Sequence, residues 1–202
     1  MPKTLRQLVK LVVMVGLLGG CYLPGTFDAA IEISRTGLYK LSYDGYIIDL
    51  NIYRDIVEKK LPPKTVKPKI DIVLADFKRD KGTKLIRYFD KGAFQVRWSK
   101  GGDLVKARQV VFFRRNENIF SITYNKDKST MTVRGKYIKK QDANRLAKMG
   151  LDVVRGFIQV KTDGQVLEHN AHKITDKGAV KIYGWEIKSI FDRAPKLVVL
   201  LR

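Results

Sequence analysis

Apolar and polar residues alternate with a period of two along most of the chain, a pattern that predicts β-strands. Between Phe27 and Ser34, for example, one face is apolar, with Phe27, Ala29, Ile31 and Ile33, whereas the other is mostly polar. Turn residues such as Asp44-Gly45 separate the alternating segments. We expect strands at 27–34, 38–49, 88–98, 104–115, 119–124, 130–135, 153–162, 165–169, 179–187 and 197–201.

Three segments instead carry apolar side chains three and four residues apart, which indicates helices. The first spans 51–60 with Asn51 as its cap, the second starts near Pro68 and ends at Gly82, and the third spans 141–149 with Gly150 at its C-cap. We predict an α+β fold: a mostly antiparallel β-sheet with two or three short helices packed on one side.

The first twenty-one residues follow the pattern of an export signal. Three cations, Lys3, Arg6 and Lys10, precede the apolar run 11–18, and small residues follow it up to Cys21. The run is shorter than the roughly 20 residues that a membrane-spanning helix requires. This order of charge, apolar core and small-residue cleavage site is that of a signal peptide.

The sequence Leu18-Gly19-Gly20-Cys21 resembles the bacterial lipobox. The resemblance implies that the Cys21 thiol receives a diacylglyceryl group before the signal is removed. It implies three parts: a signal peptide at 1–20, a lipidated tether at 21–26 and a single α+β domain at 27–202. The alternatives are an ordinary secretory signal, a retained membrane anchor, and a cytosolic protein whose first helix buries the thiol.

The same resemblance implies a location. In Gram-negative lipoproteins, aspartate directly after the lipidated cysteine retains the protein at the inner membrane, and this chain has Tyr22 there. We therefore expect the periplasmic face of the outer membrane, or the outer leaflet of the plasma membrane if the organism has one membrane.

The chain is strongly basic, with 40 Lys and Arg against 20 Asp and Glu, a formal net charge of +20. The excess lies mostly after residue 60, because residues 1–20 carry +3, residues 21–60 carry −1 and residues 61–202 carry +18. Such a field favours polyanionic partners: anionic lipid, lipopolysaccharide, cell-wall polymers or nucleic acid. Export to the envelope argues against nucleic acid. A generally basic proteome would produce the same composition without any such partner.

Several cations cluster near the end of the second expected helix and along the strands that follow it. There they complement the helix dipole, so the cluster has a structural explanation as well as a binding one. We take as anion-binding candidates Lys78, Arg79, Lys81, Lys84, Arg87, Arg97, Arg114 and Arg115.

The histidines His169 and His172 are the strongest candidates for chemistry. Metal binding would require further ligands, for which Asp163, Glu168 and Asp176 are available. An odd spacing at the end of a strand places the two rings on opposite faces, so we favour a turn around Asn170. We expect no metal, no cofactor and no enzymatic activity, and retain a hydrolase using this region only as a third hypothesis.

Residues 157–202 resemble the end of a group of bacterial envelope lipoproteins of unknown function, and are similar to the lipid-binding lipoproteins of the LppM type. The likeness lies in Val160-Lys161-Thr162-Asp163-Gly164, His169-Asn170-Ala171, Trp185 and Ala194-Pro195. It implies a fold more than an activity.

Two functions remain in view. The first is a membrane-anchored binding module for an anionic envelope component. The second is a structural subunit of a larger envelope or secretion assembly, for which the apolar segment 197–201 would offer a strand edge to a protein partner.

Overall fold

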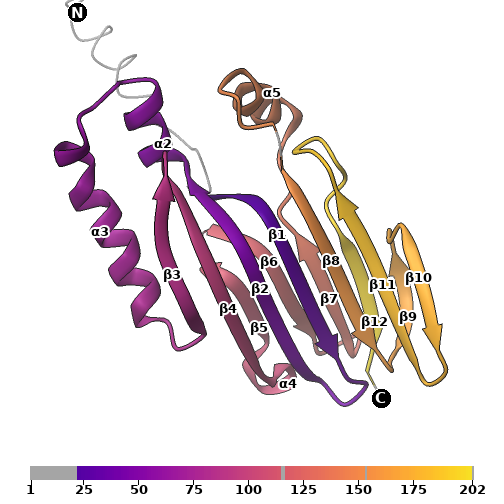
Figure 1. Ribbon diagram of the computed structural model, residues 1–202. Coiled ribbons are helices and arrows are strands. Elements are labelled where there is room, and N and C mark those ends of the chain that lie inside the picture. Colours follow the sequence, from indigo (N-terminus) through magenta and orange to yellow (C-terminus); the bar gives the residue numbers. More distant parts are fainter. Residues whose placement is uncertain (1–21, 115–116, 153, 202) are drawn as a thin grey trace, which may run out of the picture.

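The computed structural model describes residues 22–114, 117–152 and 154–201, which form two β-sheets with helices at their margins (Figure 1). The expected signal peptide, Cys21 and Arg115 lie outside the described residues. The α+β class expected from the sequence is confirmed. The strands, however, divide between two sheets, because an alternating strand shows which face it buries but not which strand it pairs with.

The larger sheet has seven strands. Adjacent strands in it are antiparallel, except for β1 and β8, which are parallel. In spatial order its strands are β10 (Lys173–Lys177), β11 (Val180–Ile187), β8 (Arg155–Thr162), β1 (Tyr22–Ile33), β2 (Leu38–Asp49), β4 (Ala93–Asp103) and β3 (Thr83–Asp90).

The smaller sheet has five strands, all of them antiparallel to their neighbours. In spatial order they are β5 (Gln109–Arg114), β6 (Glu117–Asn125), β7 (Thr130–Gly135), β12 (Lys196–Leu200) and β9 (Gln165–His169).

The helices of the described residues are α2 (Leu50–Val57), α3 (Pro63–Arg79), α4 (Leu104–Ala107) and α5 (Lys140–Lys148). The cap of α2 is Asp49, two residues before the predicted Asn51, and its carboxylate accepts the backbone N–H groups of Asn51 and Ile52 at 2.9 Å. Gly150 follows α5 in the left-handed conformation, at φ +75°, as the sequence predicted.

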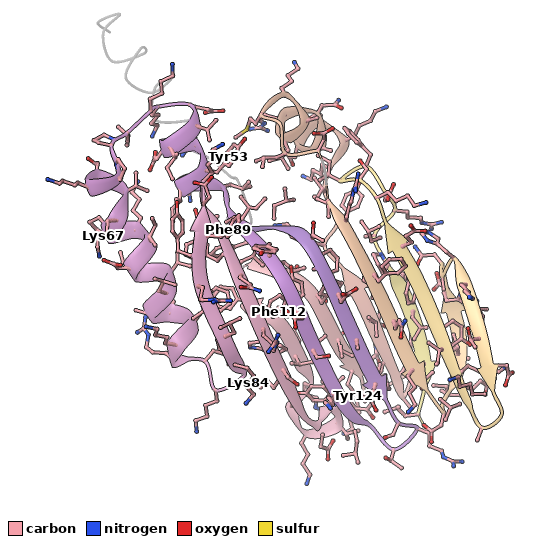
Figure 2. The ribbon with its side chains drawn as sticks, in the orientation of Figure 1. Tyr53, Lys67, Lys84, Phe89, Phe112 and Tyr124 are labelled. Carbon is pink, nitrogen blue, oxygen red and sulfur yellow. The ribbon has the colours of Figure 1, made fainter. Side chains whose placement is uncertain are left out.

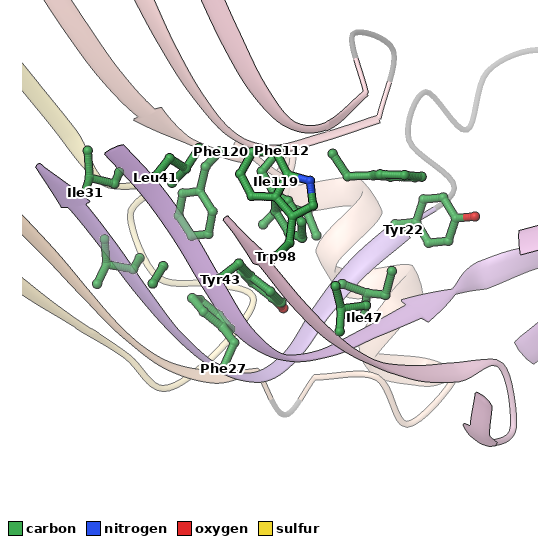
Figure 3. Close-up of a cluster of buried hydrophobic side chains, with 14 of the residues drawn as sticks. Tyr22, Phe27, Ile31, Leu41, Tyr43, Ile47, Trp98, Phe112, Ile119 and Phe120 are labelled. Carbon is green, nitrogen blue, oxygen red and sulfur yellow. The ribbon is translucent and has the colours of Figure 1, made fainter. Parts of the chain in front are cut away.

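The core lies between the two sheets. The alternating apolar residues of β1, β2 and β4 face those of the smaller sheet, and Tyr43 stacks on Phe112 of β5 with ring centroids 4.4 Å apart (Figure 3). Helix α3 packs beside β3, and its Phe77 stacks on Phe113 of β5 at 3.8 Å. Helix and smaller sheet thus cover one face of the larger sheet, whose other face carries exposed charges such as Glu32 and Lys161.

The residues that we predicted as a tether belong to the folded domain. Tyr22, Leu23 and Pro24 pair with Asp49, Ile48 and Ile47 of β2, and these first residues of β1 are buried. A register shift between Pro24 and Phe27 accommodates the Pro-Gly pair that suggested a linker. The described part of the domain thus already includes Tyr22.

Further elements differ from the expectation. The segment 88–98, expected as one strand, is divided between β3 and β4, and α3 begins at Pro63 instead of near Pro68. Residues 104–107 form a helical turn, because Asp103 accepts the N–H groups of Val105 and Lys106. Strand β10 was not predicted, since its segment shows little alternation. Strand β12 lies between β7 and β9, so the apolar C-terminal segment is not an edge that a partner could use.

Candidate anion-binding site

A basic groove lies where α3 ends and β3 begins, and Asp80 builds this turn. Its carboxylate accepts the backbone N–H of Gly82 at 2.7 Å and the indole Nε1–H of Trp98 at 3.2 Å. A Cβ at Gly82 would lie 2.5 Å from Trp98 Nε1, so only glycine allows the chain to pass the indole this closely. The turn is thereby fixed against β4.

The groove has a volume of about 830 Å³. We define the α3–β3 groove by its lining residues: Asp76, Arg79, Asp80, Lys81, Gly82, Ser99, Lys100 and Gly101.

The carboxylates of the α3–β3 groove are engaged within the protein, whereas its lysines are not. Asp76 accepts a hydrogen bond from Arg79, and Asp80 holds the turn. Within the described residues, neither Lys81 nor Lys100 forms an ion pair, and both are exposed. The groove therefore offers positive charge to a ligand without a competing intramolecular anion on either lysine.

The structure separates the predicted cations. Arg79 and Lys81 line the groove and Lys78 is exposed on the last turn of α3, while Lys84 lies at the start of β3 (Figure 2). Arg87 donates to Gln95, and Arg97 pairs with Asp44 at 2.8 Å. These two arginines lie on the outer face of the larger sheet. The side chain of Arg114, like Arg115, is outside what the structure describes.

Sequence reasoning missed Ser99, Lys100 and Gly101. We expected the strand to end at residue 98, whereas β4 continues through both Gly101 and Gly102 to Asp103. The sequence contains four Lys-Gly pairs, at 81–82, 91–92, 100–101 and 177–178, and only the fold shows that the first and the third line one groove.

A second charged cluster holds α2 against α3. Asp55, 1% exposed, accepts hydrogen bonds from Lys59 and Lys69, and these bonds lower the pKa of its carboxyl group. Burial instead raises the pKa of Asp49, although its bonds to the N–H groups of Ile52 and Asn51 oppose the shift. Because the charges of Lys59 and Lys69 are paired with Asp55, the cluster stabilises the fold and presents little free charge to a ligand.

The motif around Asn170 forms a structural unit that we call the Asn170 clasp: Asn170, Trp185, Ala194 and Lys196. The Asn170 Oδ1 accepts Trp185 Nε1–H at 2.9 Å and the Lys196 backbone N–H at 2.7 Å, and its Nδ2 donates to Ala194 O at 2.9 Å. One side chain thus joins β11 of the larger sheet to β12 of the smaller.

The two histidines stabilise the same turn. His169 Nδ1 accepts the backbone N–H of Ala171, and His172 Nδ1 accepts that of Glu186, both at 3.2 Å. The part of the chain that the structure describes contains no group of three or more His, Cys, Asp or Glu residues placed to hold a metal ion. Over the same residues, no helix is long and apolar enough to cross a membrane.

Comparison with solved structures gives a weak likeness. The chain is similar to the NMR structure of the folded domain of LppM from Mycobacterium tuberculosis, with a TM-score of 0.45 and 10% identity over 93% of this chain and 94% of that one. No protein-family model matches, and no curated protein matches significantly. No residue role is transferred from this likeness.

Proposed function

We propose that the chain is a membrane-anchored envelope lipoprotein whose domain is a non-enzymatic binding module for an anionic envelope component: a lipid, lipopolysaccharide or a cell-wall polymer. The observation that carries the proposal is the α3–β3 groove, where Lys81 and Lys100 form no ion pair with any residue that the structure describes. The net charge of +20 supports it, because a positive field raises the local concentration of polyanions.

The lipobox supports the anchor and Tyr22 the outer-membrane location, on its periplasmic face. Since β1 begins at Tyr22, no flexible linker separates a lipid on Cys21 from the folded domain. A trans peptide step advances the chain by about 3.8 Å. The domain would therefore be held directly against the head groups.

Binding is tested with the purified lipidated protein and three probes: phosphatidylglycerol in phosphatidylcholine vesicles, lipopolysaccharide, and a soluble teichoic-type polyphosphate polymer. Because the acyl chains insert into any vesicle, the first probe is scored as the gain over pure phosphatidylcholine vesicles. The variant Lys81→Gln/Lys100→Gln removes the two free charges. The control Lys126→Gln/Lys128→Gln removes two exposed lysines from the β6–β7 turn, so both variants have the same net charge.

We expect at least one probe to bind, with about tenfold or greater weakening in the groove variant and less in the control. Binding should also weaken steeply with salt, because the Debye length falls from about 8 Å at physiological salt to about 3 Å at 1 M. Equal weakening in both variants would show that net charge, and not the groove, attracts the ligand. No binding to any probe at low salt would reject the proposal.

The anchor has its own test, because the Cys21→Ser variant removes the acylated thiol. We expect metabolic labelling with a clickable fatty acid to mark the wild-type protein and not the variant, and the variant to keep its signal peptide. An unlabelled wild type, or a variant labelled equally well, would contradict the lipid anchor.

The second candidate function is a structural subunit of an envelope assembly, and one observation favours it. The final residues of β4 have an open edge, described below, although the C-terminal segment that first suggested this function is internal. Crosslinking in intact cells followed by purification tests it. Recovery of this protein without any partner would count against the assembly role.

A further inference from the structure

Strand β4 extends beyond its pairing with β3, so that one of its two edges is partly uncovered. Its pairing with β3 ends at Thr83 and Trp98, whereas its pairing with β2 continues to Leu38 and Asp103. Residues 99–103 thus have a described strand neighbour on one side only. This half-covered stretch forms one wall of the α3–β3 groove.

The backbone groups at this edge point into the groove. The Ser99 N–H donates to Gly82 O at 2.9 Å, on the side away from β2. Because backbone directions repeat every second residue in a strand, the N–H and C=O of Gly101 point to that same side. Both Gly101 and Gly102 are exposed, so no side chain blocks the approach of another backbone.

Exposed edges are usually protected by charge. The groove presents Arg79, Lys81 and Lys100 around the open edge, whereas its carboxylates, Asp76 and Asp80, accept hydrogen bonds from within the protein. Lysines at an edge repel a basic strand, including a second copy of this chain, which itself carries +20. An acidic strand would be attracted by the same side chains.

We propose that the α3–β3 groove binds an extended acidic peptide, which adds to β4 at residues 99–103 in line with β3. Backbone hydrogen bonds at Gly101 hold the peptide and the groove cations select its acidic side chains, the mode known as β-strand addition. The inference concerns the same groove and goes beyond the proposed function, because its ligand has a peptide backbone, which a lipid or lipopolysaccharide lacks. A phosphate polymer or lipid head group would use the lysines and leave the Gly101 N–H unused.

The test compares two synthetic peptides on the purified lipidated protein in non-ionic detergent. Both alternate Glu with Val and Thr over eight residues, and one is N-methylated at every second residue so that its charge is kept while its edge N–H groups are lost. We expect the N-methylated peptide to bind at least tenfold more weakly. Equal binding of the two peptides would overturn β-strand addition.

A variant tests the same bond from the protein side. Gly101→Pro removes the outward N–H without touching the pairing with β2, and proline is tolerated on edge strands. Its Cβ would meet Tyr39 O at 3.1 Å, so a small local shift is expected. Peptide binding should fall at least tenfold, and by clearly more than the binding of inorganic polyphosphate; equal loss of both would contradict the assigned bond.

The outcomes separate the two proposals. If polyphosphate or anionic vesicles bind and neither peptide does, the inference fails while the proposed function stands. If the acidic peptide binds and depends on its N–H groups, the inference holds even where vesicles fail to bind. If nothing anionic binds, both are wrong. The peptide comparison uses the wild-type protein, so it decides the question even if Gly101→Pro does not fold.

Discussion

The Asn170 clasp and the α3–β3 groove are built on opposite principles. In the clasp, three hydrogen bonds to Oδ1 and Nδ2 engage one side chain with Trp185, Ala194 and Lys196. In the groove, Lys81 and Lys100 have no ion pair within the described residues, and β4 leaves one edge uncovered. The first arrangement leaves little for a ligand to gain, whereas the second leaves charge and backbone groups available.

The comparison shows why a conspicuous motif is a poor guide to a binding site. The segment from His169 to His172 drew attention because it combines both histidines with asparagine, yet its side chains hold a turn. Lys100 and Gly101 drew none, although the fold brings them beside Lys81. If this contrast is correct, substitutions in the clasp should alter stability, whereas substitutions of the groove lysines, Lys81 and Lys100, should not.

The largest effect is expected from Asn170→Ala. The change leaves Trp185 Nε1–H and the Lys196 N–H without their acceptor, and an unsatisfied buried donor costs about 1–3 kcal/mol. We expect the free energy of unfolding to fall by about 2–4 kcal/mol, measured by urea denaturation. A loss below about 1 kcal/mol would show that the clasp does not join the two sheets.

The sequence pattern was sufficient to predict the elements that depend on local residues. It was not sufficient to predict which strands pair with one another. Alternation identified β1 from Phe27 onward, and the position of Gly150 identified the end of α5. Pattern gave no information on which sheet each strand joins, since both sheets bury alternating apolar residues. The extension of β1 to Tyr22 was also hidden, because a Pro-Gly pair normally marks a linker and here lies in a bulge.

The site was predictable in part for the same reason. The last turn of α3 is basic in the sequence, and Arg79 and Lys81 do line the groove. Arg87 and Arg97 alternate along strands, and alternation placed them on the outer face with partners of their own, Gln95 and Asp44. The missing half of the groove comes from β4, which only the tertiary fold brings to the end of α3.

The next largest effect is expected from Asp55→Asn, in the charged cluster that holds α2 against α3. The buried carboxylate would no longer attract Lys59 and Lys69, whose side chains are each 53% exposed. Losing a partner from a buried pair costs about 3–5 kcal/mol, and solvent screening of half-exposed lysines reduces this, so we expect about 1–3 kcal/mol at pH 7. Urea denaturation measures it.

The stability difference between wild type and Asp55→Asn should depend on pH. Because hydrogen bonds lower the pKa of Asp55 in the folded protein, its contribution is complete above the unfolded value of about 3.9 and is lost as pH falls through the folded pKa. The difference between wild type and Asp55→Asn should therefore shrink in acid. A difference that stays constant down to pH 2 would exclude the ionic contribution.

A smaller effect is expected from His169→Ala/His172→Ala. Each ring accepts one backbone N–H in an exposed position, and such a bond contributes about 0.5–1 kcal/mol. We expect stability to fall by about 1–2 kcal/mol and binding of anionic probes to remain at the wild-type level. A stable double variant that lost the protein's function in cells would revive the hydrolase hypothesis.

The smallest effect on stability should come from Lys81→Gln/Lys100→Gln, the change that matters most for binding. Neither lysine supports the fold through an ion pair in the described residues, and surface substitutions of this kind shift stability by no more than about 0.5 kcal/mol. Removing two cations from a chain of net charge +20 also reduces self-repulsion, so the shift should be zero or slightly stabilising. Thermal unfolding of this variant beside Lys126→Gln/Lys128→Gln measures it. A clear destabilisation confined to the groove variant would mean that these lysines have structural partners, and the contrast between groove and clasp would disappear.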